Sequence, residues 1–356
     1  MKTISHFYHD KPLFGLDIGF SSLKVMQISQ ADASRELQII GYGIADFDPA
    51  LLNEGVIINP EILAKAANNL FKNQIKGEIT TNRVVMGVPA SRTYSRIIKL
   101  PKLEDKELAA AVQLEAEQYI PIPLDQLYLD YQVIRRTKEE IELFAVAAPK
   151  KIVDSYFILA EMLGLEAVAM ETTVNATSRL FTYTDFSHEP SILIDFGSIA
   201  ADITIYDKAM VVTGTVSSGS DSFTASIAKK LGVTLQEAAI IKSKYGVDPS
   251  KKQKEIVEAV KPQLEQLLRE IRRMIRYYEE RSGSDNKVSQ VVTVGGGASM
   301  PGLNAHLTEL LRLPTRMIDP WQHINFDKLP LPGPSDRSVH STVCGLALLK
   351  PEEIFS

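Results

Sequence analysis

Two segments that lie half a chain apart share one pattern of hydrophobic and polar positions. Each is an apolar strand that ends in Asp-x-Gly, continues through a few small residues and enters a second strand of alternating pattern. Such alternation around a short turn is typical of a β-hairpin. The first copy holds Asp17 and Gly19 and the second holds Asp195 and Gly197, so the two aspartates are 178 positions apart (195 minus 17). We therefore predict two lobes whose hairpin tips close on one phosphate chain.

The first half of the chain is predicted to form a mixed sheet that is interrupted by a compact inserted unit. After the first hairpin, a strand is expected over residues 38–46, a helix over 60–73 and a strand over 83–89. From residue 94 the sequence pattern predicts a β-α-β-β-α unit, with elements over 94–100, 103–119, 127–135, 141–148 and 150–163. Strands followed by a helix and another strand favour a sheet that is covered by helices.

The second half adds more helix around the second hairpin. Helices are expected over 222–231, 235–245, 303–311 and 341–349, and strands over 210–216 and 288–294. A long stretch, 251–281, places its apolar residues on one stripe, which is a strong helical signal. We expect Pro262 to kink this helix or to start a second one, because proline removes a backbone donor. Arginines and glutamates alternate along the rest of the stretch, a pattern typical of a solvated helix face.

Composition narrows the class of protein. The 356 residues exceed one ordinary domain, and the net charge of −5 argues against a nucleic-acid binder, which needs clustered basic residues. A lone cysteine, Cys344, excludes an intrachain disulfide and suggests a buried thiol in a reducing compartment. Residues 1–11 are expected to form a loose leader, and 350–356 are too short for an amphipathic anchor. Contact with a membrane is therefore expected only through a partner.

The first hairpin carries residue types that suit a phosphate. Gly19 permits a turn that a Cβ would obstruct, Ser21 and Ser22 can offer hydroxyls and amides, and Lys24 supplies a positive charge. Asp17 and Asp195 are repelled by bare phosphate, and a hydrated Mg²⁺ ion between carboxylate and phosphate removes this conflict. The pattern favours a magnesium–phosphate site. The alternative is two ordinary hairpins with Asp-x-Gly turns.

A third element is a strand that runs into Gly295, Gly296 and Gly297. Three glycines let the backbone approach a flat adenine and its ribose closely, and a helix follows, as in other nucleotide loops. The alternative is a plain flexible loop, which can also contain three consecutive glycines. Neither GxxxxGK[ST] nor a GxGxxG after the opening strand occurs, which excludes a P-loop enzyme and leaves a Rossmann fold without its fingerprint.

The order of these elements resembles the actin-like ATPase superfamily. The inserted unit is similar to that of the cell-division protein FtsA and of the type IV pilus assembly protein PilM, and the Glu-Gln-Tyr-Ile-Pro block at 117–121 most resembles the PilM family. The resemblance runs from about residue 13 to the end. It implies an α/β, actin-like (ribonuclease H-like) fold of two lobes with ATP between them and an FtsA/PilM-type inserted subdomain.

The resemblance also implies subdomain boundaries. Subdomain 1A of the first lobe would hold residues 1–93, with 165–190 and about 338–356, and the inserted subdomain 1C would hold 94–164. Subdomain 2A of the second lobe would hold 191–221 and 287–337, and the helical subdomain 2B would hold 222–286.

Site residues are carried over from the family where this sequence matches its motifs. They are Asp17, Gly19, Ser21, Ser22 and Lys24 in the first phosphate hairpin, Asp195 and Gly197 in the second, Gly219 and Ser220 in the turn after it, Lys242 at the nucleoside and Gly295, Gly296 and Gly297 at the adenosine. Asp17 and Asp195 would hold Mg²⁺ through water. Three positions depart from the family: Phe20 replaces a small hydroxyl residue, Ala200 replaces Thr and Ala239 replaces Glu. These departures imply modest nucleotide affinity or slow hydrolysis.

A catalytic base is expected in the crossover between the lobes, at residues 170–176. Glu171 or Asn175 could orient the attacking water there. The alternative for both residues is a role in capping and hydrogen bonding at the start of a helix.

The function that the resemblance implies is that of a cytoplasmic ATP-binding adaptor at the inner face of the cell membrane. It would hold the N-terminal cytoplasmic peptide of a PilN-like membrane protein in a groove between the first lobe and the inserted unit. ATP would control contact with PilN or with the pilus motor ATPases, and self-association is left open. The alternatives are an FtsA-like division or filament protein and a sugar or acetate kinase of the same superfamily.

Overall fold

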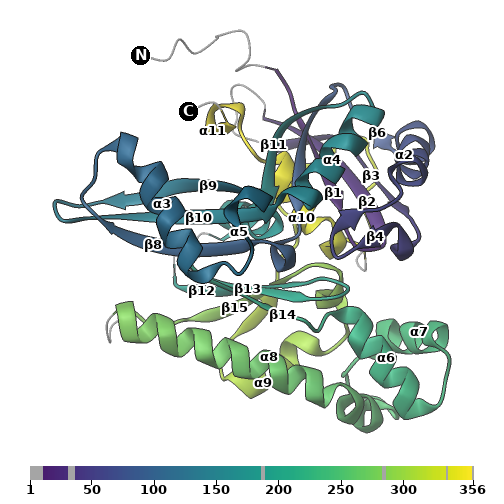
Figure 1. Ribbon diagram of the computed structural model, residues 1–356. Helices are drawn as coiled ribbons and strands as arrows, with labels where there is room; N and C mark the ends of the chain where they lie inside the picture. The colour runs from purple at the N-terminus through teal and green to yellow at the C-terminus, as the bar shows by residue number, and fades with distance from the viewer. Residues whose placement is uncertain (1–10, 31–36, 186–188, 283–285, 334–335, 355–356) are drawn as a thin grey trace.

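The computed structural model describes residues 11–30, 37–185, 189–282, 286–333 and 336–354. The leader expected at the N-terminus therefore lies outside the described residues, apart from Lys11, as do the last two residues of the chain. Figure 1 shows two lobes, one above the other, with a smaller unit that projects sideways from the upper lobe.

The upper, first lobe is built on a mixed sheet with strand order β11-β7-β1-β2-β3-β17. The strands are β1 (Phe14–Ile18), β2 (Ser22–Gln30), β3 (Leu37–Asp46), β7 (Arg83–Val88), β11 (Glu166–Thr172) and β17 (Ile324–Asn325), with β6 (Lys76–Gly77) beside β3. β1 is antiparallel to β2 and parallel to β7. A small pair, β4 (Leu52–Asn53) with β5 (Val56–Ile57), lies apart from this sheet.

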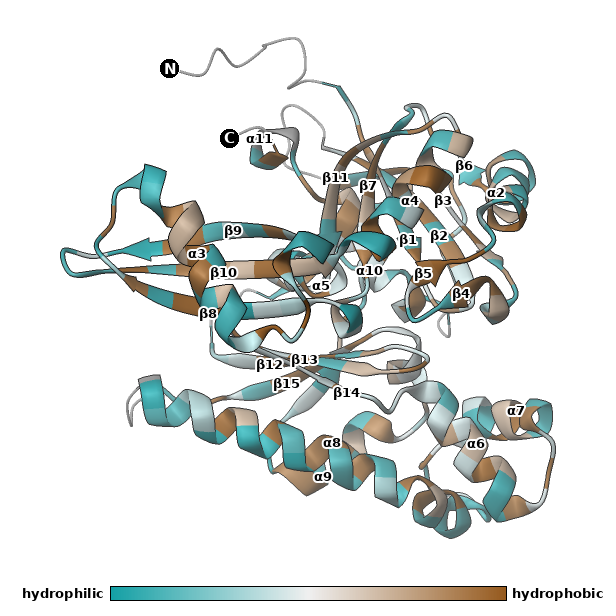
Figure 2. Ribbon diagram, in the orientation of Figure 1, coloured by the Kyte–Doolittle hydropathy of each residue, from teal (hydrophilic) through white to brown (hydrophobic). Residues whose placement is uncertain are grey.

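Alternation along β1 gives the first sheet two buried faces. Phe14 and Leu16 pack on one face against α2 (Pro60–Asn69), which continues as a π-helical turn to Gln74, and against α4 (Lys150–Met162). The other face is covered by α5 (Thr173–Thr184) and α10 (Ser341–Ala347). Side chains of successive strand residues point to opposite faces, so a strand with helices on both sides is apolar throughout. β1 and β7 are buried along their whole length, with Asp17 and Arg83 as charged exceptions, and Figure 2 shows hydrophobic colour within this sheet.

The inserted unit is the side projection in Figure 1. It is a three-stranded antiparallel sheet of order β8-β10-β9, from β8 (Tyr94–Pro101), β9 (Leu127–Arg136) and β10 (Glu140–Pro149), covered by α3 (Asp105–Tyr119). Its own core includes Leu100, Val112 and Leu143. The elements follow the predicted β-α-β-β-α order along the chain, but the last helix, α4, packs on the sheet of the first lobe.

The second lobe contains a five-stranded sheet of order β14-β13-β12-β15-β16. Its elements are β12 (Ser191–Phe196), β13 (Ala201–Asp207), β14 (Ala209–Val216), β15 (Gln290–Val294), β16 (Thr315–Met317), α6 (Ser220–Leu231), α7 (Leu235–Tyr245), α8 (Gln253–Ser282) and α9 (Leu303–Leu311). The second helix that Pro262 was expected to start, as the alternative to a kink, is wrong: α8 continues as a single helix through it. Its apolar stripe is buried against the sheet, and this burial offsets the backbone bond that proline removes.

Two features tie the lobes together. A shared core brings Met26 and Tyr42 of the first sheet against Val292 and Val294 of the second. α5, which covers the first sheet, also contacts β12 and β13 of the second sheet. It crosses α10 so closely that a Cβ on Gly345 would lie 1.9 Å from the carbonyl oxygen of Ala176. A short C-terminal helix, α11 (Pro351–Ile354), follows α10.

The segment expected to belong wholly to the second lobe, 287–337, is divided between the lobes. β17 lies within it but pairs in parallel with β3 of the first sheet. Trp321 is buried in the same shared core. The pairing links strands more than 280 residues apart, which the local pattern cannot predict.

Candidate functional site

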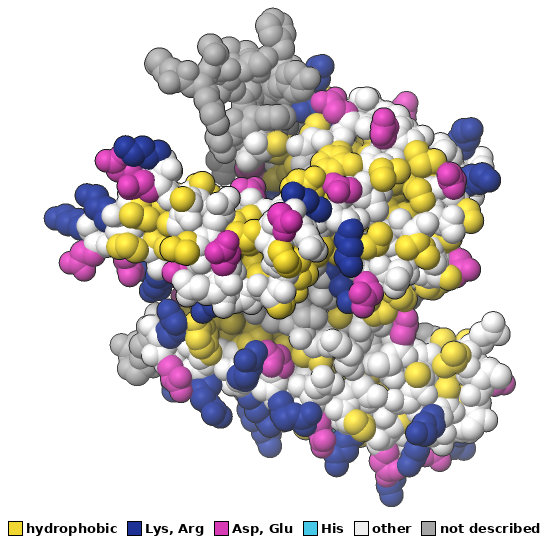
Figure 3. Space-filling view, in the orientation of Figure 1, with side chains coloured by type: hydrophobic (Ala, Val, Ile, Leu, Met, Phe, Trp, Pro, Cys, Tyr) yellow, Lys and Arg dark blue, Asp and Glu magenta, His cyan; other side chains and the backbone are white. Residues whose placement is uncertain are grey.

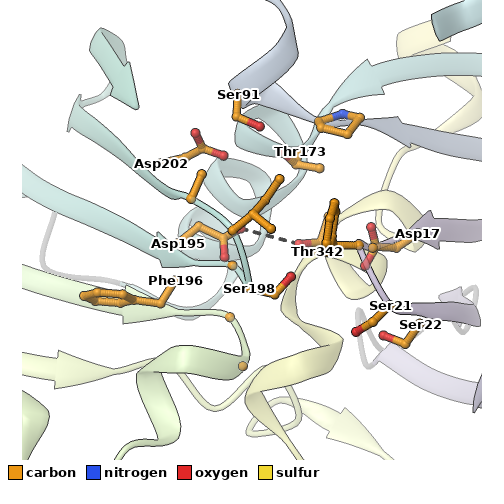
Figure 4. A pocket seen from close by; sticks show the side chains of 18 of the residues that line it. Asp17, Ser21, Ser22, Ser91, Thr173, Asp195, Phe196, Ser198, Asp202 and Thr342 are labelled. Atoms are coloured by element: carbon orange, nitrogen blue, oxygen red, sulfur yellow. Dashed lines mark hydrogen bonds between the residues drawn. The ribbon is translucent and has the colours of Figure 1, made fainter. Parts of the chain in front are cut away.

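The two hairpin tips predicted from the sequence line one cavity between the lobes. The cavity has a volume of about 280 Å³ and takes its walls from both hairpins, from the three-glycine segment and from the start of α10. Figure 4 shows Asp195 inside it, with Asp17, Ser21 and Ser22 on the opposite side. The expected geometry of two facing carboxylate-tipped hairpins is therefore present.

The first hairpin holds a buried ion pair. Asp17 and Lys24 face each other across β1 and β2, and the Lys24 ammonium lies 3.1 Å from the Asp17 carboxylate. The turn is closed by a bond from the Gly19 amide to the carbonyl of Ser22. A Cβ on Gly19 would lie 2.9 Å from the Lys24 ammonium. The lysine ammonium therefore lies directly beside the glycine, where a larger residue would have to displace it.

The second hairpin is anchored on the start of α6. The amides of Ser220 and Asp221 donate to the carbonyls of Gly197 and Ser198 in the hairpin tip. A Cβ on Gly219 would lie 2.3 Å from the Ser198 oxygen, so this close approach needs glycine. Gly219 thus shapes the site from behind, whereas Ser220 lines the cavity itself.

Asp195 is held where a neighbouring glycine leaves room for its carboxylate. Gly295 follows β15, which runs parallel to β12, and a Cβ there would lie 2.3 Å from Asp195 Oδ1. The φ of +82° at Gly295 also favours glycine. On its other side the carboxylate accepts a long bond of 3.5 Å from the Thr342 hydroxyl in the first lobe, the dashed line in Figure 4.

The electrostatics of Asp195 are unfavourable to its charge. The pKa of Asp195 is raised to about 7, first by burial and then by the nearby carboxylates of Asp202 and Asp17, whereas Lys24 and Thr342 act in the opposite direction. A carboxyl group whose pKa is raised by burial and by like charges is typical of a site that binds a cation.

Asp202 is a site residue that the sequence analysis did not single out. It lies directly opposite Asp195 on β13, lines the cavity and accepts a 2.6 Å bond from the Thr215 hydroxyl. Burial raises its pKa to about 6, and the Thr215 bond opposes the rise. The signal was present in the hairpin, because residues equally spaced from a turn face each other across it.

The other newly found lining residues come from distant segments. Ser91 follows β7, Thr173 begins α5, and Thr342 is in the first turn of α10. The Thr173 hydroxyl also accepts a 3.1 Å bond from the amide of Ala90, which fixes the loop that carries Ser91. No local sequence pattern identifies these residues.

The three glycines lie where the sequence placed them. All three line the cavity, and they pack so closely that a Cβ on Gly297 would lie 2.8 Å from Cβ of Phe196 and one on Gly296 would lie 3.0 Å from Val339. Side chains at these positions would fill the space between the segment and the second hairpin.

Lys242 lies behind the cavity and does not line it. Its ammonium donates to the carbonyl and hydroxyl of Ser220, at 2.9 and 2.5 Å, and to the hydroxyl of Thr224 at 2.7 Å. Burial lowers its pKa, and Asp221 opposes this change. In this structure Lys242 therefore orients Ser220.

Glu171 also lies outside the residues that line the cavity. Its two carboxylate oxygens accept bonds of 2.6 and 2.7 Å from Arg179, which in turn donates to the carbonyl of Gly345. Burial raises the pKa of Glu171, and Arg179 opposes the rise. The carboxylate joins β11, α5 and α10, and this geometry corresponds to the structural alternative. Asn175, the other candidate, is likewise absent from the lining.

The lining suits a hydrated cation beside an anion. Within the described ranges, no group of three or more His, Cys, Asp or Glu side chains is arranged to hold a metal ion. Mg²⁺ usually keeps several waters and binds through one or two carboxylates plus substrate phosphates. The facing pair Asp17 and Asp195 can supply the carboxylates.

Comparison with solved structures confirms the actin-like fold. A PilM–PilN type IV pilus biogenesis complex matches with a TM-score of 0.80 and 24% identity, over 95% of this chain and 98% of that one. MreB 5 of Spiroplasma citri, bound to AMPPNP, matches with a TM-score of 0.51 and 14% identity over 94% and 95% of the two chains. The ethanolamine utilization protein EutJ from Carboxydothermus hydrogenoformans matches with a TM-score of 0.54 and 12% identity over 96% and 91%.

Sequence comparisons identify the family. The cell division protein FtsA of Borreliella burgdorferi is 24% identical over 350 residues, 86% of this chain and 84% of its own. No helix in the described part of the chain has both the length and the apolar character to cross a bilayer. The model of the family described as type IV pilus assembly protein PilM matches residues 15–350. Because this match leaves out only the two ends, the chain belongs to the PilM family of type IV pilus assembly proteins.

Proposed function

We propose that this protein is the adaptor of a type IV pilus machine that holds Mg-ATP between its lobes and binds the N-terminal cytoplasmic peptide of a PilN-like membrane protein. The observation that carries the nucleotide part is the pair of aspartates, Asp17 and Asp195, presented by matching hairpins to one cavity. MreB 5, a relative in fold, was solved with a nucleotide analogue bound.

The lining residues divide the ligand between them. Asp17 and Asp195 hold Mg²⁺ through its water shell, and Lys24 with Ser21 and Ser22 faces the phosphates. The three glycines lie on the side of the cavity where a flat base can approach the backbone. The carboxylate of Glu171 is paired with Arg179 and takes no part in hydrolysis. The nucleotide acts as a control of lobe closure.

The partner peptide is assigned to the junction of the first lobe and the inserted unit. The junction exposes large apolar side chains on α4, with Phe157, Ile158 and Met162 exposed to 45%, 48% and 44%. Tyr128, the second residue of β9, donates a hydrogen bond to Asp154 of α4 and extends the surface into the inserted unit. Figure 3 shows hydrophobic side chains over this part of the upper lobe. The PilM–PilN complex, a relative in fold, supports a partner of this kind.

In this proposal the protein works at the inner face of the cell membrane, where the PilN-like protein holds it. Lobe closure around ATP would change the angle between the inserted unit and the second lobe. Contacts with the pilus motor ATPases, or between copies of the chain, would then respond to nucleotide as well.

Removing charged groups from the cavity is expected to weaken Mg-ATP binding. Lys24→Ala and Asp195→Ala each remove a charge-assisted contact, worth about 1–3 kcal/mol. Calorimetric titration with Mg-ATP measures the loss, and Lys106→Ala, at an exposed lysine of α3, is the matched control. Unchanged affinity in both cavity variants would contradict the site assignment.

Mg-ATP affinity is also expected to depend on pH. With a pKa of about 7, Asp195 is mostly protonated at pH 6 and must lose its proton to face Mg²⁺. Affinity should therefore rise about tenfold from pH 6 to pH 8, as the ionised fraction increases. Asp195→Asn is the control, because the titration of ATP itself is common to both proteins. An equal pH dependence in the two proteins would show that Asp195 is not the responsible group.

Shortening one apolar side chain on α4 is expected to weaken peptide binding. A synthetic peptide with a PilN-like N-terminal sequence should bind the wild-type chain, and Phe157→Ser should cost about 1–2 kcal/mol through lost apolar contact. Fluorescence anisotropy, with and without Mg-ATP, measures both values. Ile240→Ser, at an exposed apolar residue of α7, is the control. The adaptor proposal fails if the peptide binds in neither nucleotide state.

A further inference from the structure

A second cavity lies between the inserted unit and the second lobe, away from the α4 surface and from the nucleotide cavity. Its volume is about 430 Å³, and its walls are β8 and α3 on one side and β14 and α8 on the other. The walls meet at Ser95 and Thr213, whose hydroxyls are 2.9 Å apart. We call this cavity the lateral cleft.

Positive charge dominates the lateral cleft, although the whole chain carries a net charge of −5. Its lining holds four cations, Arg96, Lys99, Arg273 and Arg281, and a single carboxylate, Glu115. Figure 3 shows Lys and Arg side chains along α8 on this face of the molecule. The alternation of Arg and Glu along α8 predicts an ordinary solvated face, whereas the fold turns two of its arginines toward the inserted unit.

The cations of the lateral cleft differ in how they are engaged. Lys99 lies 3.8 Å from carboxylates of its own sheet, and Arg273 pairs with Glu270 on its own helix. Within the described ranges, no carboxylate lies within ion-pair distance of Arg96 or Arg281. Each wall therefore contributes one guanidinium without an acidic partner.

Both of these guanidinium groups are placed over aromatic rings. Arg96 lies 4.9 Å from the centroid of Tyr119, and Arg281 lies 5.1 Å from that of Tyr277. Arg281 also donates a 2.9 Å bond to the Tyr277 hydroxyl. Stacking restricts the side chain while leaving most N–H donors of the planar fork available, which prepares it for a carboxylate.

The floor of the lateral cleft suits an extended chain. β8 and β14, the edge strands of their sheets, lie beside each other there. Half-buried apolar side chains, Ile97 and Val211, alternate with the polar lining. An extended segment points successive side chains to opposite sides, so acidic residues could face the arginines while apolar ones face the floor.

We propose that the lateral cleft binds an extended acidic segment of a protein partner, in which glutamate or aspartate alternates with apolar residues. Arg96 and Arg281 take its carboxylates from opposite walls, and its apolar side chains contact the half-buried Ile97 and Val211. The site is separate from the surface assigned to the PilN-like peptide, and its occupation does not require bound nucleotide.

The test uses the full chain and a fluorescent ten-residue peptide of alternating Glu and Val, with anisotropy as the readout. Wild-type protein should bind it, and raising the salt concentration should weaken binding. Arg96→Gln/Arg281→Gln should lower the affinity at least about tenfold, since each arginine makes a charge-assisted contact. Lys138→Gln/Arg269→Gln is the matched control: it removes the same charge from exposed positions of the same two units, outside the cleft. It should bind like wild type.

Several results would overturn the proposal. One is that the wild-type protein does not bind the peptide at millimolar concentration. Another is that the two double variants lose affinity for the peptide equally. Equally tight binding of a Lys-Val peptide would also exclude charge recognition. Vesicles containing phosphatidylglycerol and a single-stranded oligonucleotide are the remaining probes. If either binds as tightly and loses affinity in the cleft variant, the cleft recognises another polyanion instead. Thermal melting of both double variants checks that they are folded, and the two single variants should each show part of the loss.

Discussion

The crowding of charge between the lobes is the constraint on which the rest of the structure depends. Asp17, Lys24, Asp195 and Asp202 share one partly buried cavity, and only one of the four is positive. Asp195 fits there because Gly295 lacks a side chain. The Lys24 ammonium likewise lies beside Gly19, which has no side chain either. Like charges held together in a protein raise the pKa values of acids and favour a bound cation. Under the proposed function, a bound Mg²⁺ ion would balance these carboxylates.

The framework that holds this cavity is made of contacts between distant segments. α5 and α10 cross at Gly345, Arg179 joins Glu171 to the same helix, and Thr342 reaches across to Asp195. The lateral cleft is bounded by the inserted unit of the first lobe and by the second lobe. A movement that closes the lobes around nucleotide therefore also changes the distance between the arginines of the lateral cleft.

Local features of this protein could be predicted from its sequence, and non-local ones could not. The hairpins at Asp17 and Asp195 follow from alternation and turn residues, and the inserted unit follows from its own pattern. The position of Glu171 depends on Arg179 and on a carbonyl near the C-terminus, and Thr342 is 147 residues from Asp195. Pro262 shows that burial of an apolar stripe can outweigh a local helix breaker. Asp202 could have been predicted, because strand register places it opposite Asp195.

A crystal structure with Mn²⁺ and AMPPNP would test the central claim most directly, because Mn²⁺ replaces Mg²⁺ and gives an anomalous signal. We predict a single Mn²⁺ peak between Asp17 and Asp195, with the phosphates at Ser21, Ser22 and Lys24 and the base beside the three glycines. A nucleotide bound elsewhere, or a metal that contacts neither aspartate, would contradict the account.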